Sequence, residues 1–122
     1  MSDIVTPAQV EFRLRQLGRE MDDAHIALVN AESEYARAKS MYEVESARAR
    51  MAIKQQSLEI GAKITVQEIE DRAMIRTEEH FTALNASEAV VRSARANVAR
   101  IRTHIDIARS VGTSVRASME VV

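Results

Sequence analysis

Cysteine is absent from this sequence of 122 residues, which also contains only one proline and three glycines. Without cysteine, disulfides and thiolate metal sites are excluded. Aromatic residues are also scarce, and no cluster of strand-forming residues bounded by turn residues is present. Ala, Arg, Glu, Met and Val are prominent instead, which is the composition of long helices, so we expect an all-α protein. The four aromatic residues are Phe12, Tyr35, Tyr42 and Phe81.

Long apolar runs are missing as well. No run approaches the roughly 18 residues that a membrane span needs. The first stretch, MSDIVTPAQVEF, lacks the basic and apolar regions of a signal peptide. The length is that of one domain. We therefore expect residues 1–122 to form a single domain of a cytoplasmic protein that has no contact with a membrane.

A helix start is visible near the beginning of the chain. Thr6 is a capping residue, Pro7 suits the first helical position, and Gln9 completes a capping box. No proline follows, and Gly61 stands where a C-terminal cap belongs. The first helix is therefore predicted over about residues 7–59, with a turn at about 60–65.

A second capping box, Thr65-Val66-Gln67-Glu68, predicts the start of the next helix. This helix is expected over about 66–119, with a candidate break at Asn85-Ala86-Ser87, near residues 85–87. Because the turn is short, the two helices should be antiparallel neighbours, so the predicted fold is a long, coiled-coil-like helical hairpin.

Apolar and small residues recur at alternating steps of three and four in both helices, which is the heptad pattern of a coiled-coil seam. In the antiparallel register, Tyr42 is expected near Leu84, and Leu14 near Gly112. The pattern weakens close to the turn, where Glu45 and then Glu70, Thr77 and His80 take seam positions. The main predicted seam residues, for the core or the oligomer, are Leu14, Leu17, Met21, Leu28, Tyr35, Tyr42, Leu84, Val91, Val98, Ile101 and Ile105.

Further apolar residues fall off these seams. A hairpin of two helices has no third layer to cover them, and surplus apolar surface is normally buried against another molecule. We therefore expect a homo-oligomer, whose number of subunits is left open. The residues are Val10, Ile26, Val29, Val44, Met51, Met74, Val90, Ile107 and Val111.

Charge is distributed in blocks although the net charge is −1. Residues 46–65 carry one acid against four bases, Arg48, Arg50, Lys54 and Lys63. These four would form a positive rim at the closed end of the hairpin, and phosphates bind such groups. The alternative is a solvated helix end, where basic residues also interact favourably with the helix dipole.

The last block, residues 89–122, carries six arginines and two acids. In the antiparallel register these arginines would lie beside acids of the first helix, so interhelical pairs would account for them. Whether the segment 92–116 binds DNA or pairs in this way is left open. The partner acids would be Glu11, Glu20, Asp22, Asp23, Glu32 and Glu34.

Catalytic patterns are not found. The three histidines, His25, His80 and His104, are far apart in sequence, and none has a known metal-ligand spacing to a carboxylate. No phosphate-binding glycine loop and no nucleophile motif is present. We expect neither an enzyme nor a cofactor nor a metal site.

The order of these features resembles that of the UvsY family, the recombination mediators of tailed phages. That family has a basic LKARLDYYSG-like stretch at the end of its first long helix, where this chain has SARARMAIK, so Arg48 and Arg50 match its two basic positions. A glycine-containing loop, a short polar helix like EIEDRAMIRTEEH and a long helix rich in small and apolar residues then follow. Here Ala52, Ile53 and Lys54 replace the acidic and aromatic residues of the family.

The resemblance, over roughly residues 35–120, implies a function. It implies a ring-like homo-oligomer that binds single-stranded DNA and helps to load a RecA-like recombinase onto strands coated by single-strand binding protein, in the host cytoplasm. Two alternatives remain open. One is a structural or scaffolding coiled coil, such as a virion-assembly chaperone or a secreted helical-hairpin partner. The other is an adaptor that binds only protein through the off-seam Met and Val residues.

Overall fold

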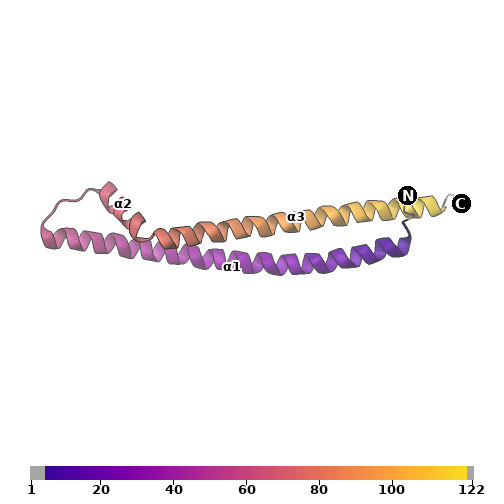
Figure 1. Ribbon diagram of the computed structural model, residues 1–122, viewed down its shortest axis with the longest axis horizontal. Coiled ribbons are helices and arrows are strands. Elements are labelled where there is room, and N and C mark those ends of the chain that lie inside the picture. Colours follow the sequence, from indigo (N-terminus) through magenta and orange to yellow (C-terminus); the bar gives the residue numbers. More distant parts are fainter. Residues whose placement is uncertain (1–4, 121–122) are drawn as a thin grey trace. The chain divides into compact units, whose positions relative to one another are not determined.

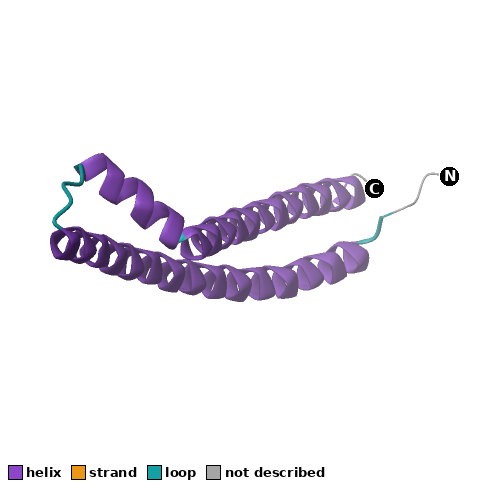
Figure 2. Ribbon diagram, turned by 60° about the vertical axis from the view of Figure 1, so that its left-hand side comes forward, coloured by secondary structure: helices purple, strands orange, loops and turns teal. Residues whose placement is uncertain are grey.

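The computed structural model describes residues 5–120, which form three helices (Figure 1). They are α1 (Pro7–Ile60), α2 (Val66–Arg76) and α3 (Glu78–Glu120). Within the described range the remaining residues are loops and turns, without a strand (Figure 2), which confirms the all-α prediction. Residues 1–4 and 121–122 lie outside the described range, and with them part of the stretch in which no signal peptide is expected.

The start of α1 is the predicted capping box. The Thr6 backbone N–H donates to Oε1 of Gln9 at 2.9 Å, and the Gln9 backbone N–H donates to Oγ1 of Thr6 at 3.2 Å. Each side chain therefore satisfies a backbone donor that has no partner inside the helix. Pro7, the first residue of α1, has no N–H to satisfy there.

The end of α1 is set by Gly61, which has a φ of 68°. Its N–H donates to the carbonyl of Leu58 at 3.3 Å, and the N–H of Ala62 donates to the carbonyl of Ser57 at 3.1 Å. This pair of bonds is the Schellman motif, which requires a left-handed residue that glycine supplies without a steric penalty. The predicted turn is thus a loop of residues 61–65.

The second helix begins as predicted and ends sooner. Oγ1 of Thr65 accepts a hydrogen bond from the N–H of Glu68 at 3.1 Å, which caps α2. The break then lies at Thr77, whose hydroxyl donates to the carbonyl of Ala73 at 2.7 Å. A threonine that bonds back to the preceding turn competes with regular helix hydrogen bonding, and here it accompanies a change of direction between α2 and α3.

The break predicted near 85–87 is wrong, because α3 is continuous there. The Ser87 hydroxyl donates to the carbonyl of Leu84 at 2.8 Å within the helix. Serine in a helix interior commonly satisfies its hydroxyl in this way, so the presence of Asn85 and Ser87 does not require a turn.

The chain divides into two compact units. Unit 1 contains the residues up to Val29 and those from Arg92 onward, and unit 2 contains Asn30–Val91. Both α1 and α3 contribute to each unit, and α2 belongs to unit 2 alone.

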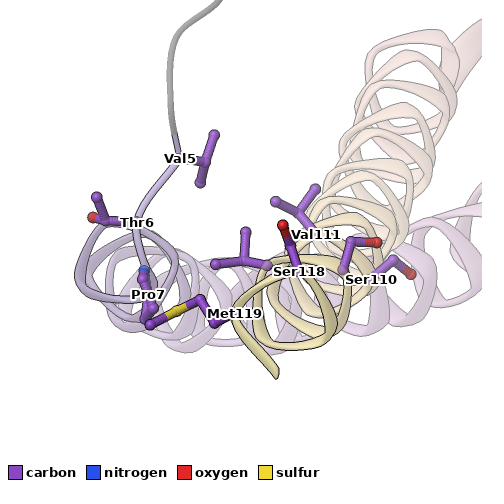
Figure 3. Close-up of a pocket in the computed structure, with 9 residues that line it drawn as sticks. Val5, Thr6, Pro7, Ser110, Val111, Ser118 and Met119 are labelled. Atoms are coloured by element: carbon purple, nitrogen blue, oxygen red, sulfur yellow. The ribbon is translucent and has the colours of Figure 1, made fainter. Parts of the chain in front are cut away.

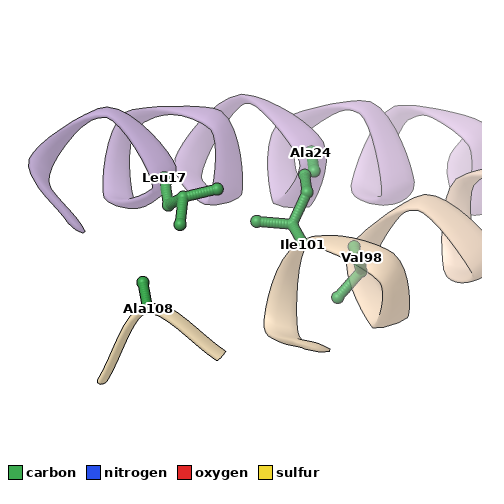
Figure 4. Close-up of a cluster of buried hydrophobic side chains, with 5 residues drawn as sticks. All are labelled: Leu17, Ala24, Val98, Ile101 and Ala108. Atoms are coloured by element: carbon green, nitrogen blue, oxygen red, sulfur yellow. The ribbon is translucent and has the colours of Figure 1, made fainter. Parts of the chain in front are cut away.

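The core of unit 1 is an apolar cluster contributed by two helices. Leu17 and Ala24 of α1 meet Val98, Ile101 and Ala108 of α3, and their side chains point toward one another (Figure 4). Leu17 is 1% exposed and Ile101 2%. Early residues of α1 pair with late residues of α3, so the two segments run antiparallel within this unit.

The end of this seam shows the same pairing. A Cβ built on Gly112 of α3 would lie 3.0 Å from Cγ1 of Val10, and Leu14 lines the same small cavity as Gly112. Leu14 is therefore near Gly112, as expected. Val10, predicted to lie off the seam, is buried because it faces this glycine.

The core of unit 2 is smaller. Ile53 of α1 packs with Ile69 and Ala73 of α2, and the half-buried Ala49 and Ile64 cover them. Elsewhere in this unit the rings of Tyr42 and Phe81 are 5.6 Å apart between centroids and tilted by 51°. This spacing lies within the range of favourable aromatic pairs. Tyr42 thus meets α3 one turn before Leu84.

All the main predicted seam residues are buried or half-buried. The seam near the loop departs from the prediction. Ser46 is buried there in place of Glu45, whose side chain is 34% exposed. Ile69 is buried in place of Glu70. Thr77 is buried as its seam position predicts.

Candidate functional site

The predicted basic rim belongs to unit 2. Arg48, Arg50 and Lys54 lie on the last four turns of α1, and Lys63 lies in the loop that follows. On a helix, Arg50 and Lys54 share a face because they are four residues apart, whereas Arg48 diverges from Arg50. The Schellman turn at Gly61 places Lys63 directly after the end of the helix.

Two members of the rim lie beside acids. Nη1 of Arg48 is 3.0 Å from Oε1 of Glu45, one turn earlier on α1. Nε of Arg50 is 3.9 Å from Oε1 of Glu70, which links α1 to α2. The Arg48 side chain is 72% exposed, and exposed ion pairs contribute little to stability. A phosphate can therefore compete with Glu45 for this guanidinium at small cost.

The two lysines of the rim are different. Lys54 and Lys63 are exposed, and neither has an ion pair within residues 5–120. A lysine ammonium is a flexible point charge with three donors, suited to phosphate contacts without fixed geometry. These lysines are the members of the rim that are free to bind an anion.

The arginines of α3 do not form the interhelical pairs that the sequence suggested. In the described part of the chain, none of them lies within 4.0 Å of a carboxylate oxygen. Instead, acids of α1 pair along their own helix, as in Arg15–Glu11 at 2.9 Å and Arg37–Glu34 at 3.9 Å. Partners three or four residues away on the same helix are closer than partners across the seam.

The two units also differ in net charge. The described residues of unit 1 contain nine arginines, no lysine and six acids, a balance of +3. Unit 2 contains eight basic residues and eleven acids, a balance of −3. The residues of the predicted rim thus belong to an acidic unit, while the arginines of α3 make unit 1 basic.

Groups that could hold a metal ion are not found within residues 5–120, where no three His, Asp or Glu residues come together suitably. His80 and His104 are half-buried and His25 is exposed. None of the described helices is long and apolar enough to cross a membrane.

Unit 1 also has an open apolar groove of about 690 Å³. Val5, Thr6 and Pro7 line it at the start of α1, facing Val111 and Met119 of α3 (Figure 3). Other off-seam apolar residues are exposed too, among them Val29 at 66% and Met51 at 70%. Apolar surface of this kind is typically covered by another molecule.

Comparisons with known proteins give no assignment. No model of a protein family matches the chain, and no curated protein or solved structure matches it significantly. The function is therefore argued from the residues and their geometry.

Proposed function

We propose that this protein is a single-stranded DNA-binding recombination mediator without enzymatic activity, which helps to load a RecA-like recombinase in phage recombination and repair. Arg48, Arg50, Lys54 and Lys63 are proposed to hold backbone phosphates. The observation that carries the proposal is the exposure of Lys54 and Lys63 without an ion pair in the described chain, beside the exposed Arg48. The resemblance to the UvsY family supplies the biological role, including the partner recombinase and single-strand binding protein.

A single rim would bind weakly. Within a homo-oligomer the same rim recurs once per subunit, and the linked sites then bind one strand with a high effective concentration. The exposed apolar residues of both units support such an oligomer, since assembly would remove them from water. An antiparallel hairpin running through the whole chain, with its loop at one end, is part of the same proposal.

The test is binding of a fluorescein-labelled oligothymidylate, followed by anisotropy at several salt concentrations with duplex DNA as competitor. The unmodified protein should bind at low salt, weaken steeply as salt rises and prefer the single strand. Changing Arg48→Ala together with Arg50→Ala should lower the slope of log K against log[salt] by about 1.4 for each subunit that contacts the strand, since each contact with a single strand contributes ~0.7.

The matched control is Arg37→Ala with Lys39→Ala. Arg37 and Lys39 are two residues apart on α1, as Arg48 and Arg50 are, and they lie in the same unit. The control substitutions therefore remove the same charge. The control should bind as the unmodified protein does, and both variants should keep its oligomer mass. Absence of binding at low salt would overturn DNA binding. Loss of mass in the Arg48/Arg50 variant would make these arginines structural.

The second candidate is a structural or scaffolding coiled coil, or an adaptor for protein alone. The observation that favours it is the number of exposed large apolar residues on both units. Stimulation of recombinase filament assembly on coated strands distinguishes it from the mediator, because a protein-only scaffold would not stimulate loading.

A further inference from the structure

Four arginines of α3 recur at intervals of seven residues. Arg95, Arg102, Arg109 and Arg116 each directly follow a residue of the α3 seam. Seven residues correspond to nearly two helical turns, so successive members are about 10.5 Å apart along the axis and drift by only ~20°. The four side chains, which we call the arginine stripe, therefore stay on one side of α3 over roughly 30 Å.

The stripe is exposed in the structure, and none of its members has an ion pair within the described residues. Three acids lie near it. Asp106 stands between Arg102 and Arg109 in sequence, Glu120 follows Arg116 by four residues, and Glu11 lines the same cavity as Arg116. Oε1 of Glu11 is already held by Arg15 at 2.9 Å. Two acids without an ion pair in the described residues thus stand against four guanidinium groups.

The residue type indicates which chemical class of ligand the stripe binds. Every basic residue of α3 is arginine. A guanidinium is always charged and presents a planar fork of donors that fits a phosphate bidentately. It is also less hydrated than an ammonium, so it loses less on leaving water. A row of such groups at a regular spacing, without neutralising partners, suits a ligand that repeats its negative charge along a line.

We propose that the arginine stripe is a second binding surface for a nucleic-acid phosphate backbone, separate from the basic rim of unit 2. The choice of nucleic acid as the polyanion rests on the proposed function. The stripe lies in the unit whose balance is +3, which favours a polyanion, whereas the rim lies in the unit whose balance is −3. Contacts to phosphates carry no base information, so binding through the stripe is independent of sequence.

The experiment compares two double variants of the full chain. Arg102→Gln with Arg109→Gln removes the centre of the stripe, whereas Arg19→Gln with Arg100→Gln removes two exposed arginines of unit 1 that lie outside it. The probes are a labelled oligothymidylate and a labelled duplex with the same number of phosphates. Both variants lose the same charge, so the comparison isolates position from net charge.

For each subunit that contacts the strand, the stripe variant should lower the salt slope on oligothymidylate by about 1.4 and the control by less than half of that, since ~0.7 is lost per phosphate contact. Equal slopes in the two variants would overturn the proposal. A larger loss on the duplex than on the single strand would assign the stripe to duplex DNA.

Two further results separate this proposal from the proposed function. If Lys54→Gln with Lys63→Gln abolishes binding while the stripe variant binds normally, the rim stands and the stripe proposal fails. If the stripe variant loses binding but the unmodified protein does not stimulate recombinase loading, the stripe stands and the mediator function fails. Absence of binding by the unmodified protein to either probe at low salt overturns both.

Discussion

In unit 1 the inward positions of α1 follow alternating steps of four and three residues from Val10 to Leu28, whereas in unit 2 they follow steps of four, three, four and four from Tyr42 to Ser57. The first pattern repeats every seven residues, and the two successive steps of four in the second depart from that repeat. One uninterrupted helix therefore presents two different faces. The change of repeat moves Ser46 and Ile53 inward and leaves Glu45 and Gln56 toward solvent.

The contents of the two cores differ accordingly. The buried cluster of unit 1 is entirely apolar, whereas unit 2 buries Ser46, Ser57 and Thr77 beside its apolar residues. Polar atoms in a core need hydrogen-bond partners, and in unit 2 two of these three side chains bond to backbone carbonyls at the ends of α1 and α2. The two cores therefore serve different purposes. The core of unit 1 packs two helices closely together, whereas the polar residues of unit 2 stabilise the points at which α1 and α2 end.

The largest effect is expected when one isoleucine is removed from each core. Ile101→Ala and Ile53→Ala should each lower the free energy of unfolding by about 2–5 kcal/mol, because both side chains are buried and leave a cavity. Urea denaturation measures the loss, and amide hydrogen exchange locates it. Exchange should accelerate mainly in the unit that carries the change, since the two cores share no buried residue.

The control is Ile75→Ala, an isoleucine of unit 2 that is 74% exposed. It should change the free energy of unfolding by no more than about 0.5 kcal/mol. If Ile53→Ala accelerated exchange equally in both units, the two cores would unfold together and the division into units would have no energetic meaning.

A smaller effect is expected at the glycines. Gly61→Ala should lower the free energy of unfolding by about 1–2 kcal/mol, because its φ of 68° is unfavourable for a residue with a Cβ. Gly18→Ala should raise it by about 0.5–1 kcal/mol, because Gly18 is inside α1 and a Cβ there would meet nothing within 4 Å. Thermal denaturation of both variants checks the signs, and a gain in stability from Gly61→Ala would contradict the Schellman turn.

Much of the fold can be predicted from local signals. The capping box at Thr6 and Gln9 and the glycine at the end of α1 have specific backbone requirements, so their positions are readable in the sequence. The heptad steps of unit 1 are equally clear. The break at Thr77 has a weaker signal, a threonine followed by Glu78 and Glu79, which is the pattern of a helix start.

The rest depends on contacts that local sequence does not carry. The burial of Ser46 in place of Glu45 could be predicted only if the position of α2 were known. Ile69 and Ala73 of α2 pack against Ile53, which therefore faces the core. The ion pairs could not be assigned either, because Glu11 and Glu34, which were expected to pair across the seam, each have an arginine three or four residues away on their own helix. The four residues proposed as the basic rim are chosen from their charge alone, whereas the pairing of Arg50 with Glu70 was not predicted.

The smallest effect is expected at the buried serines of unit 2, and it has opposite signs at the two positions. Oγ of Ser46 is buried without a hydrogen-bond partner, so Ser46→Ala should raise the free energy of unfolding by about 0.5–1 kcal/mol by removing an unsatisfied polar atom. Oγ of Ser57 donates to the carbonyl of Ala62, so Ser57→Ala should lower it by about 1 kcal/mol. Urea denaturation of the two variants in parallel measures the difference. A loss of stability in Ser46→Ala would mean that this hydroxyl has a partner in solution, such as a bound water, and the core of unit 2 would then be as well satisfied as that of unit 1.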